Sequence, residues 1–144
     1  MKLSTKGRYG LRALLDLAVN SEGSHVSLYN IADRQKISVN YLEQVFSTLR
    51  KSGIVRSIKG AQGGYMLDVN PASIKVGDIL RNLEGSLSVV DDGPEENIGS
   101  MERCIRAKVW NRLNESINNV IDSITLQDLI TEYRHSANYM MYYI

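Results

Sequence analysis

Residues 38–65 of the chain read SVNYLEQVFSTLRKSGIVRSIKGAQGGY. Ser38 is a favourable N-cap for a helix. The apolar side chains that follow it recur at i, i+3, i+4 and i+7, the spacing of an amphipathic helix; they are Leu42, Val45, Phe46 and Leu49. Gly53 fits the left-handed position of a Schellman motif, with Leu49 and Ile54 placed for the accompanying apolar contact. The stretch therefore predicts a helix with an explicit stop signal.

Two β-like runs follow this stop, at residues 54–58 and 65–69. The turn between them, residues 59–64, is rich in glycine, so the two runs predict a β-hairpin. After Asn70-Pro71 breaks the chain, a short helix is expected to end at Gly85.

Two more helices are expected before this stretch. One spans residues 5–19, and a shorter one begins at Leu28 with Ser27 as its N-cap. The order of helix, helix, turn, helix and hairpin is that of a winged helix–turn–helix. We therefore predict a mostly α protein, in which residues 1–85 form a winged helix–turn–helix DNA-binding domain with a two-stranded β wing.

The second half of the chain carries a long helical stripe. Residues 86–100 read as a loop with acidic turn chemistry, which we expect to be an effector region. Apolar positions then recur at helical spacing from Met101 to Ile124, more than one small domain needs to cover. We assign residues 101–134 to dimerisation helices, the last of which begins at a capping-box-like sequence at Thr125 and ends near Tyr133, and residues 135–144 to a tail. The alternative is a core helix within one chain.

The polar face of the helix after Ser38 suits base recognition. Asn and Gln side chains can pair with adenine, Glu can accept a hydrogen bond from cytosine, and Arg can contact guanine or phosphate. In a helix–turn–helix the amino end of the second helix enters the major groove. The alternative is an ordinary solvated helix face with no partner.

The Gly-rich turn strengthens the DNA-binding interpretation. Arg56 and Lys59 lie on the expected strand and turn, and the glycines Gly60, Gly63 and Gly64 would let the backbone approach another molecule. A phosphate-binding loop of an enzyme does not fit, because the turn leads into a strand and no Lys-Ser or Lys-Thr follows. A purely structural turn remains an alternative for Gly63 and Gly64.

The charge of the chain is divided between its halves. Residues 1–69 carry ten basic and five acidic side chains, a net +5, whereas residues 70–144 carry seven and eleven, a net −4. The total of +1 hides this division, and a field depends on where the charges lie. The first half is therefore suited to phosphate, and the second is not.

Four motifs carry a resemblance to a known family: KGRY at 6–9, ISVNYLEQVF at 37–46, LRKSG at 49–53 and GAQGGY at 60–65. Together they resemble the Rrf2 family of bacterial transcription regulators, from Met1 to about Tyr133. The resemblance implies a homodimer on a palindromic site in double-stranded DNA, in iron–sulfur, cysteine or redox-related gene control. The DNA-binding residues would be Arg8, Tyr9, Ser38, Asn40, Tyr41, Glu43, Gln44, Arg50, Lys51, Ser57, Lys59 and Gly60. The dimer interface would be formed by Ile105, Val109, Trp110, Leu113, Ile117, Val120 and Ile121.

Cysteine usage departs from the family pattern. Cluster-binding members carry three cysteines between the fourth and fifth helices, whereas this chain has Cys104 alone. One cysteine forms no internal disulfide, and two histidines with it do not complete a four-ligand zinc site. We therefore expect no cofactor and no metal; the alternative is an atypical iron–sulfur cluster with Cys104 as one ligand. Without a cluster, Cys104 is either a thiol or redox sensor, since basic neighbours Arg103 and Arg106 favour thiolate, or inert.

These patterns favour a transcription regulator, and we expect a repressor. An alternative is control through a protein partner, for which the acidic loop at 91–96 and the Tyr-rich tail are candidate surfaces. An enzyme is not expected, because no nucleophile, base and orienting group fall at a recognisable spacing. The amino terminus has no apolar run of signal-peptide length and no segment reaches about 20 apolar residues, so we expect a cytoplasmic protein with no membrane contact.

Overall fold

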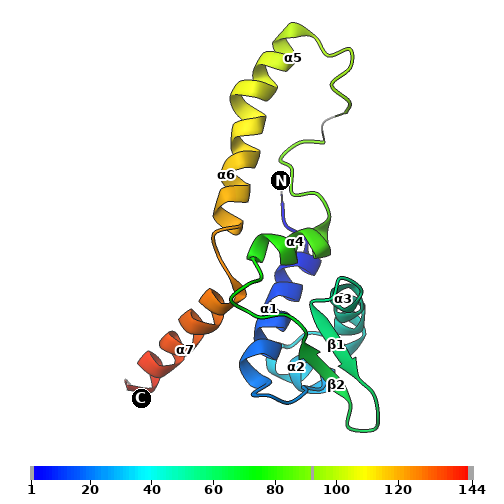
Figure 1. The fold of residues 1–144 in the computed structure, drawn as a ribbon, viewed down its shortest axis with the longest axis vertical. Helices are drawn as coiled ribbons and strands as arrows, with labels where there is room; N and C mark the ends of the chain where they lie inside the picture. The colour runs from blue at the N-terminus through cyan, green and yellow to red at the C-terminus, as the bar shows by residue number, and fades with distance from the viewer. Residues whose placement is uncertain (1, 92, 143–144) are drawn as a thin grey trace.

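The computed structural model describes residues 2–91 and 93–142, as a compact body from which a long helical arm projects (Figure 1). The elements are helices α1 (Thr5–Asn20), α2 (Leu28–Gln35) and α3 (Val39–Lys51), strands β1 (Val55–Ile58) and β2 (Gly64–Leu67), helices α4 (Val76–Glu84) and α5 (Ser100–Ile105), the π-helical segment η1 (Arg106–Trp110), and helices α6 (Asn111–Ile121) and α7 (Leu126–Tyr142). The body consists of α1–α4, the hairpin and the start of α7; the arm consists of α5, η1 and α6.

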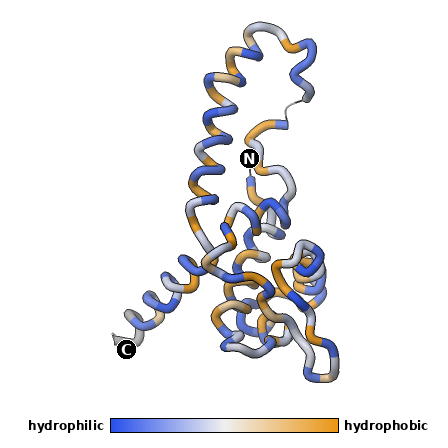
Figure 2. Tube along the Cα trace, in the orientation of Figure 1, coloured by the Kyte–Doolittle hydropathy of each residue, from blue (hydrophilic) through white to orange (hydrophobic). Residues whose placement is uncertain are grey.

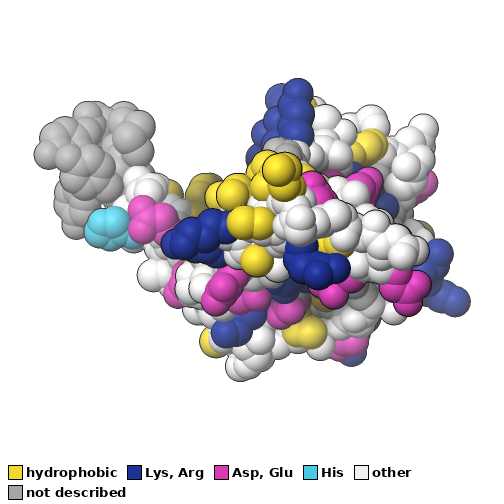
Figure 3. Space-filling model, turned by 90° about the horizontal axis from the view of Figure 1, so that it is seen from above, with side chains coloured by type: hydrophobic (Ala, Val, Ile, Leu, Met, Phe, Trp, Pro, Cys, Tyr) yellow, Lys and Arg dark blue, Asp and Glu magenta, His cyan; other side chains and the backbone are white. Residues whose placement is uncertain are grey.

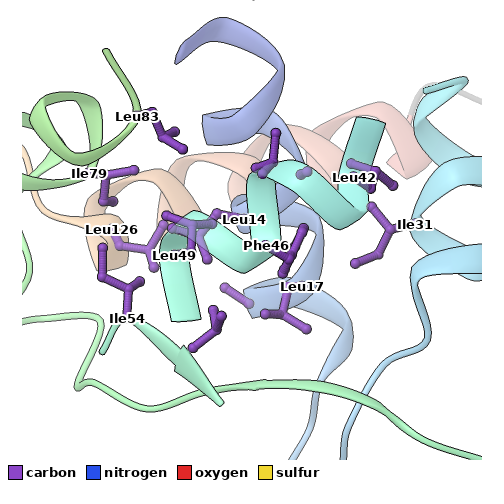
Figure 4. Packing of buried hydrophobic residues seen from close by; sticks show 14 of the residues in the cluster. Leu14, Leu17, Ile31, Leu42, Phe46, Leu49, Ile54, Ile79, Leu83 and Leu126 are labelled. Atoms are coloured by element: carbon purple, nitrogen blue, oxygen red, sulfur yellow. The ribbon is translucent and has the colours of Figure 1, made fainter. Parts of the chain in front are cut away.

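The body is built around the apolar face of α3. Phe46, Leu42 and Leu49 are fully buried together with side chains from α1, α2 and α4 (Figure 4). The ring of Phe46 lies 5.1 Å from that of Tyr65 on β2, so the hairpin packs directly against the same helix. The predicted amphipathic stripe thus forms the centre of the core.

The predicted helix boundaries of the helix–turn–helix are confirmed. The Ser27 Oγ accepts a hydrogen bond from the Asn30 N–H, and the Ser38 Oγ accepts one from the Tyr41 N–H, each at 3.2 Å. At the end of α3, the Ile54 N–H donates to the Leu49 carbonyl at 3.0 Å, the hydrogen bond that defines a Schellman motif. Gly53 has the left-handed φ of 79° that this motif requires.

The hairpin is antiparallel, with Val55 opposite Leu67 and Ile58 opposite Gly64. A third segment joins it, because Val26 and Tyr65 exchange two backbone hydrogen bonds of 2.9 Å. Gly64 lies so close to the Val26 backbone that a Cβ atom at position 64 would collide with it. The segment before α2 is therefore bound to the second strand of the hairpin by backbone hydrogen bonds.

An acceptor distant in sequence caps the first helix. The Glu84 Oε1 accepts hydrogen bonds from the Ser4 N–H at 2.8 Å and the Gly7 N–H at 3.0 Å, and from the Ser4 hydroxyl at 2.6 Å. This carboxylate, at the end of α4, supplies the negative charge that the amino end of α1 favours. The Glu84 carboxylate therefore offsets the unfavourable interaction between the helix dipole and the basic residues at the start of α1.

The arm is a nearly continuous helix that leaves the body through α6 (Figure 1). None of its side chains is buried, although apolar residues recur along its length (Figure 2). The η1 segment is a single widened turn within it, which shifts the helical register. Residues 86–91 follow the end of α4, and residues 93–99 precede α5 at the far end of the arm.

The last helix is longer than the sequence predicted. It begins as expected, since the Thr125 Oγ1 accepts a hydrogen bond from the Asp128 N–H at 3.0 Å and the Asp128 carboxylate accepts one from the Thr125 N–H at 2.9 Å. The predicted end near Tyr133 is wrong, because α7 continues to Tyr142. Residues 134–142 hold no glycine or proline that would stop it. The predicted tail, 135–144, is therefore helical as far as the structure describes it; residues 143–144 lie outside the described residues.

Candidate DNA-binding surface and effector region

The polar face of α3 is open to solvent. Asn40, Glu43 and Gln44 are exposed near its amino end, and Arg50 and Lys51 near its carboxyl end. The order along the helix is therefore amide and carboxylate groups first, then guanidinium and ammonium groups. The first kind can recognise base edges and the second can contact phosphates.

A group of aromatic and basic side chains connects α1 to the amino end of α3. The Tyr9 and Tyr41 rings meet edge to face with centroids 6.3 Å apart, and the Tyr41 hydroxyl lies 3.3 Å from the Thr5 Oγ1. The guanidinium groups of Arg8 and Arg12 lie 5.7 Å and 4.9 Å from the Tyr9 ring centroid. Both cations are thus held beside the helix–turn–helix at favourable cation–π distances. Thr5 was missed in the sequence, where no pattern connects it to Tyr41.

The wing exposes Ser57, Lys59 and Gly60, the three residues predicted there. Gly60 has a φ of 121° and open space around it, so its backbone is accessible to another molecule. The expectation is wrong for Gly63 and Gly64, because they lie against the backbone of their own chain, at Ile58 and Val26. Because they lack a side chain, these two glycines can pack closely against that backbone. This agrees with the alternative that they have a structural role.

His25 lies in the segment before α2 and contacts the turn of the wing. Its Nε2 forms a hydrogen bond with the Gln62 carbonyl. Beside it, Tyr29 on the first turn of α2 is 75% exposed. A hollow of about 520 Å³ separates this turn from the wing, with Asn30 and Gly60 among its lining residues. Neither His25 nor Tyr29 was predicted, because the strand pairing that brings residue 26 to the hairpin has no local sequence signal.

An ion pair between a buried carboxylate of α1 and an exposed arginine of α2 joins the two helices. The Asp16 carboxylate, almost fully buried, accepts hydrogen bonds from the Arg34 Nη2 at 2.7 Å and Nε at 3.0 Å, and from the Gln35 side chain at 2.8 Å. The hydrogen bond to Asp16 raises the pKa of Arg34 above its ordinary value. Because α2 is the first helix of the helix–turn–helix, this pair sets its position relative to α1.

Among the residues that the structure describes, much of the predicted dimer stripe is exposed on the arm. Ile105, Val109 and Leu113 are each about two-fifths exposed, Val120 is 59% exposed and Met101 is 83% exposed. Trp110 and Ile117 are half-buried. Ile121 differs from the rest of the prediction, because it packs against Val76, Leu80 and Leu87 of its own body.

Figure 3 views the molecule from above, and hydrophobic side chains gather on that face with basic and acidic side chains around them. Among the described residues, no helix is long and apolar enough to cross a membrane. The stripe is therefore an exposed apolar surface on an otherwise charged arm.

Cys104 is exposed on α5, near the far end of the arm. Of its two basic neighbours, Arg106 lies 3.5 Å from the Glu102 carboxylate. Within residues 2–91 and 93–142, no three His, Cys, Asp or Glu side chains come together to hold a metal ion. Iron–sulfur clusters are held mainly by thiolates, and Cys104 is the one thiol that the sequence supplies.

The fold and the exposed faces define a class: a winged helix–turn–helix DNA-binding protein with an additional helical arm. The Rrf2 family, described as an iron-dependent transcriptional regulator, matches residues 3–132. The chain belongs to the Rrf2 family, and it is a transcription regulator rather than an enzyme.

Its relatives support this assignment. The regulator CymR of Bacillus subtilis is 41% identical over 144 residues, which is the whole of both chains. The solved structure of CymR, titled the global cysteine regulator of B. subtilis, has a TM-score of 0.78 and 42% identity, covering 92% of this chain and 98% of that one. The structure of T. potens IscR has a TM-score of 0.75 and 45% identity, covering 94% and 90%.

Proposed function

We propose that this protein is a homodimeric repressor that binds a palindromic operator through its two winged helix–turn–helix domains. The observation that carries the proposal is the coexistence of two unpartnered surfaces: the polar face of α3 beside the wing, and the apolar stripe of the arm. The first suits DNA and the second suits another apolar surface. Repression would follow where the operator overlaps a promoter, because the bound dimer would then obstruct transcription.

The arm supports a second copy of the chain as its partner. A stripe that repeats every three or four residues along some 20 residues of helix can pack against the same stripe on an identical helix. In a two-fold dimer, the same patch of both chains then forms the interface. Two winged domains related by that axis would contact two inverted half-sites, so the dimer implies a palindrome.

The proposed roles at the DNA follow from side-chain chemistry. Asn40, Glu43 and Gln44 recognise base edges in the major groove from the amino end of α3. Arg50 and Lys51 from α3, Lys59 and the Gly60 backbone from the wing, and Arg8 from α1 contact phosphates. Ser38, Tyr41 and Tyr9 hold the amino end of α3 in place, and the Ser38 hydroxyl still has a proton to donate because its oxygen serves as the cap. Ser57 contacts the backbone next to Lys59.

Control of cysteine, iron–sulfur or redox genes is the second part of the proposal. It is supported by the likeness to CymR, a relative titled a global cysteine regulator. We propose that regulation uses no cofactor, because Cys104 is the chain's single thiol. Cys104 then acts as a thiol sensor or is inert, and the acidic loop at 91–96 is the candidate surface for a protein partner; Asp92 lies outside the described residues.

DNA titrations with three variants test the main proposal. Glu43→Ala and Gln44→Ala are expected to change base preference, at a cost of about 1–3 kcal/mol for the preferred base pair. Lys59→Ala is expected to weaken binding to all sequences alike and to lower the salt slope by about one. If all three variants weaken binding uniformly with no change in preference, α3 is not the recognition helix.

The absorbance spectrum of protein purified without oxygen tests the cofactor proposal. A colourless protein that binds its operator is the expected result. A visible band that disappears in Cys104→Ser would indicate a thiolate-bound cluster and would contradict it.

A further inference from the structure

A polar joint connects the arm to the body. The Arg81 guanidinium, from α4, donates to both carboxylate oxygens of Asp122 at 2.9 Å, and to the Asn118 Oδ1 at 2.9 Å. Gly77, one turn earlier on α4, leaves room for the Asp122 carboxylate, since a Cβ atom at position 77 would collide with it. The joint is thus a bidentate, charge-assisted contact between the two parts of the molecule.

A third residue extends this contact along α6. The Asn114 Oδ1 accepts a hydrogen bond from the Val89 N–H at 2.8 Å, and its Nδ2 donates to the Ser88 Oγ at 3.1 Å. Positions 114, 118 and 122 are four residues apart and therefore lie on one side of α6. Exposed apolar residues occupy other positions on the arm, so α6 has a polar side toward its own body and a separate, exposed apolar side.

Apolar packing secures only the base of the arm. Ile121 and Ile124 pack against Val76, Leu80 and Leu87, and the Val76 N–H donates to the Ile124 carbonyl at 2.8 Å. Above that base, a hollow of about 290 Å³ lies between body and arm, lined by Arg81, Asn114 and Asn118 with residues 85–88. Besides this base and the backbone bridge between Lys75 and Thr125, the hydrogen bonds of Arg81 and Asn114 join the arm to the body, so these polar contacts help to set the angle of the arm.

The arm is a long lever. Residues 100–121 span about 33 Å of helix at 1.5 Å per residue. A tilt of about 10° at its base displaces the far end by about 6 Å, more than the rise of about 3.4 Å per base pair along DNA. A small change in the angle at the joint therefore moves the far end of the arm by more than one base-pair step.

We infer that Arg81, with Asn118 and Asp122, is a positioning residue that fixes the angle between body and arm and thereby determines which spacing between two half-sites the dimer accepts. The inference rests on the proposed dimeric DNA binding. It adds that spacing specificity resides in a joint distant from the DNA surface, whereas base specificity resides in α3.

The first test is binding to duplexes that carry the same two half-sites at different separations. The wild-type protein is expected to prefer one spacing over its neighbours, one base pair shorter or longer, by at least about tenfold, because a misplaced half-site costs a contact or DNA deformation. Arg81→Ala is expected to reduce this preference to about threefold or less with the half-site sequence unchanged. Arg112→Ala, which removes an exposed arginine of α6 outside the joint, is the matched control and is expected to keep the wild-type preference. An unchanged preference in a folded, dimeric Arg81→Ala would overturn the inference.

The second test needs no DNA. Cys104 is the only cysteine of the chain and lies on the arm, so a spin label there pairs with one at Ala61→Cys in the wing turn. With labelled chains diluted in unlabelled protein, the distance distribution is expected to be narrow in the wild type and broader in Arg81→Ala. A distribution equally narrow in both would contradict the joint even if the protein binds no palindrome, so the two proposals can fail separately. If Arg81→Ala does not fold, Asp122→Asn and Asn118→Ala decide the question by the same measurement.

Discussion

Helix α3 and the arm carry the same kind of apolar repeat in sequence, yet their apolar side chains have opposite environments. Leu42, Phe46 and Leu49 of α3 are completely buried. Met101 and Val120 of the arm are more than half exposed, and no arm residue is buried. Helical periodicity therefore predicts which side chains share a face, but not whether the chain itself covers that face. The exposed face of the arm is where we propose that a second copy of the chain binds.

The largest effect should come from the covered face. Phe46→Ala removes a buried ring that contacts Tyr65 and is expected to destabilise the body by about 3–5 kcal/mol, measured by urea unfolding. The loss of stability should come from the body alone, because Phe46 packs in the core of the body. A destabilisation below about 1 kcal/mol would mean that α3 is not the centre of the core.

On the uncovered face, Leu113→Ala should act on association instead. Both copies lose the same side chain in a two-fold interface, so the dimer dissociation constant should rise by about 10–100-fold, measured by sedimentation equilibrium. The helical content of the dissociated chain should match that of the wild type. A wild-type protein that is monomeric at all concentrations, or a variant with the wild-type constant, would refute the assignment of this stripe.

A smaller effect is expected at the cap of α1. Glu84→Ala leaves the Ser4 and Gly7 N–H groups without their acceptor and should cost about 1–2 kcal/mol in the unfolding of the body. Asp68→Ala, which removes an exposed carboxylate after β2, is a comparison variant expected to cost less. Equal losses of unfolding free energy in the two variants would mean that the Glu84 cap stabilises the body no more than an ordinary exposed carboxylate does.

The smallest effect concerns pH and the joint. The hydrogen bonds from Arg81 hold the pKa of Asp122 below its ordinary value, and those to Asp122 raise the pKa of Arg81. The contribution of a carboxylate with a lowered pKa is present above its unfolded-state pKa and is lost as the pH falls through the folded-state pKa. The difference in thermal midpoint between wild type and Asp122→Asn should therefore be constant near neutral pH and vanish only in acid, below about pH 4. A difference that changes between pH 6 and 8 would point to another group.

Much of the body was predictable because its signals are local. The caps at Ser27 and Ser38, the stop at Gly53 and the hairpin each depend on neighbouring residues, and the structure confirms them. The pairing of Val26 with Tyr65 and the cap from Glu84 were not predictable, since they join residues about 40 and 80 positions apart. The length of α7 was missed because aromatic and apolar residues near the end of the chain resembled a tail. The positions of the candidate DNA contacts on exposed faces are established, whereas their individual roles remain predictions.

Selection of the protein's preferred sites from a pool of random duplexes tests the central claim most directly. If two winged bodies are held together by their arms, the enriched sequences will contain two inverted copies of one half-site at a fixed separation. Enrichment of a single unpaired motif would contradict the dimer, and no enrichment at moderate salt would contradict sequence-specific DNA binding itself.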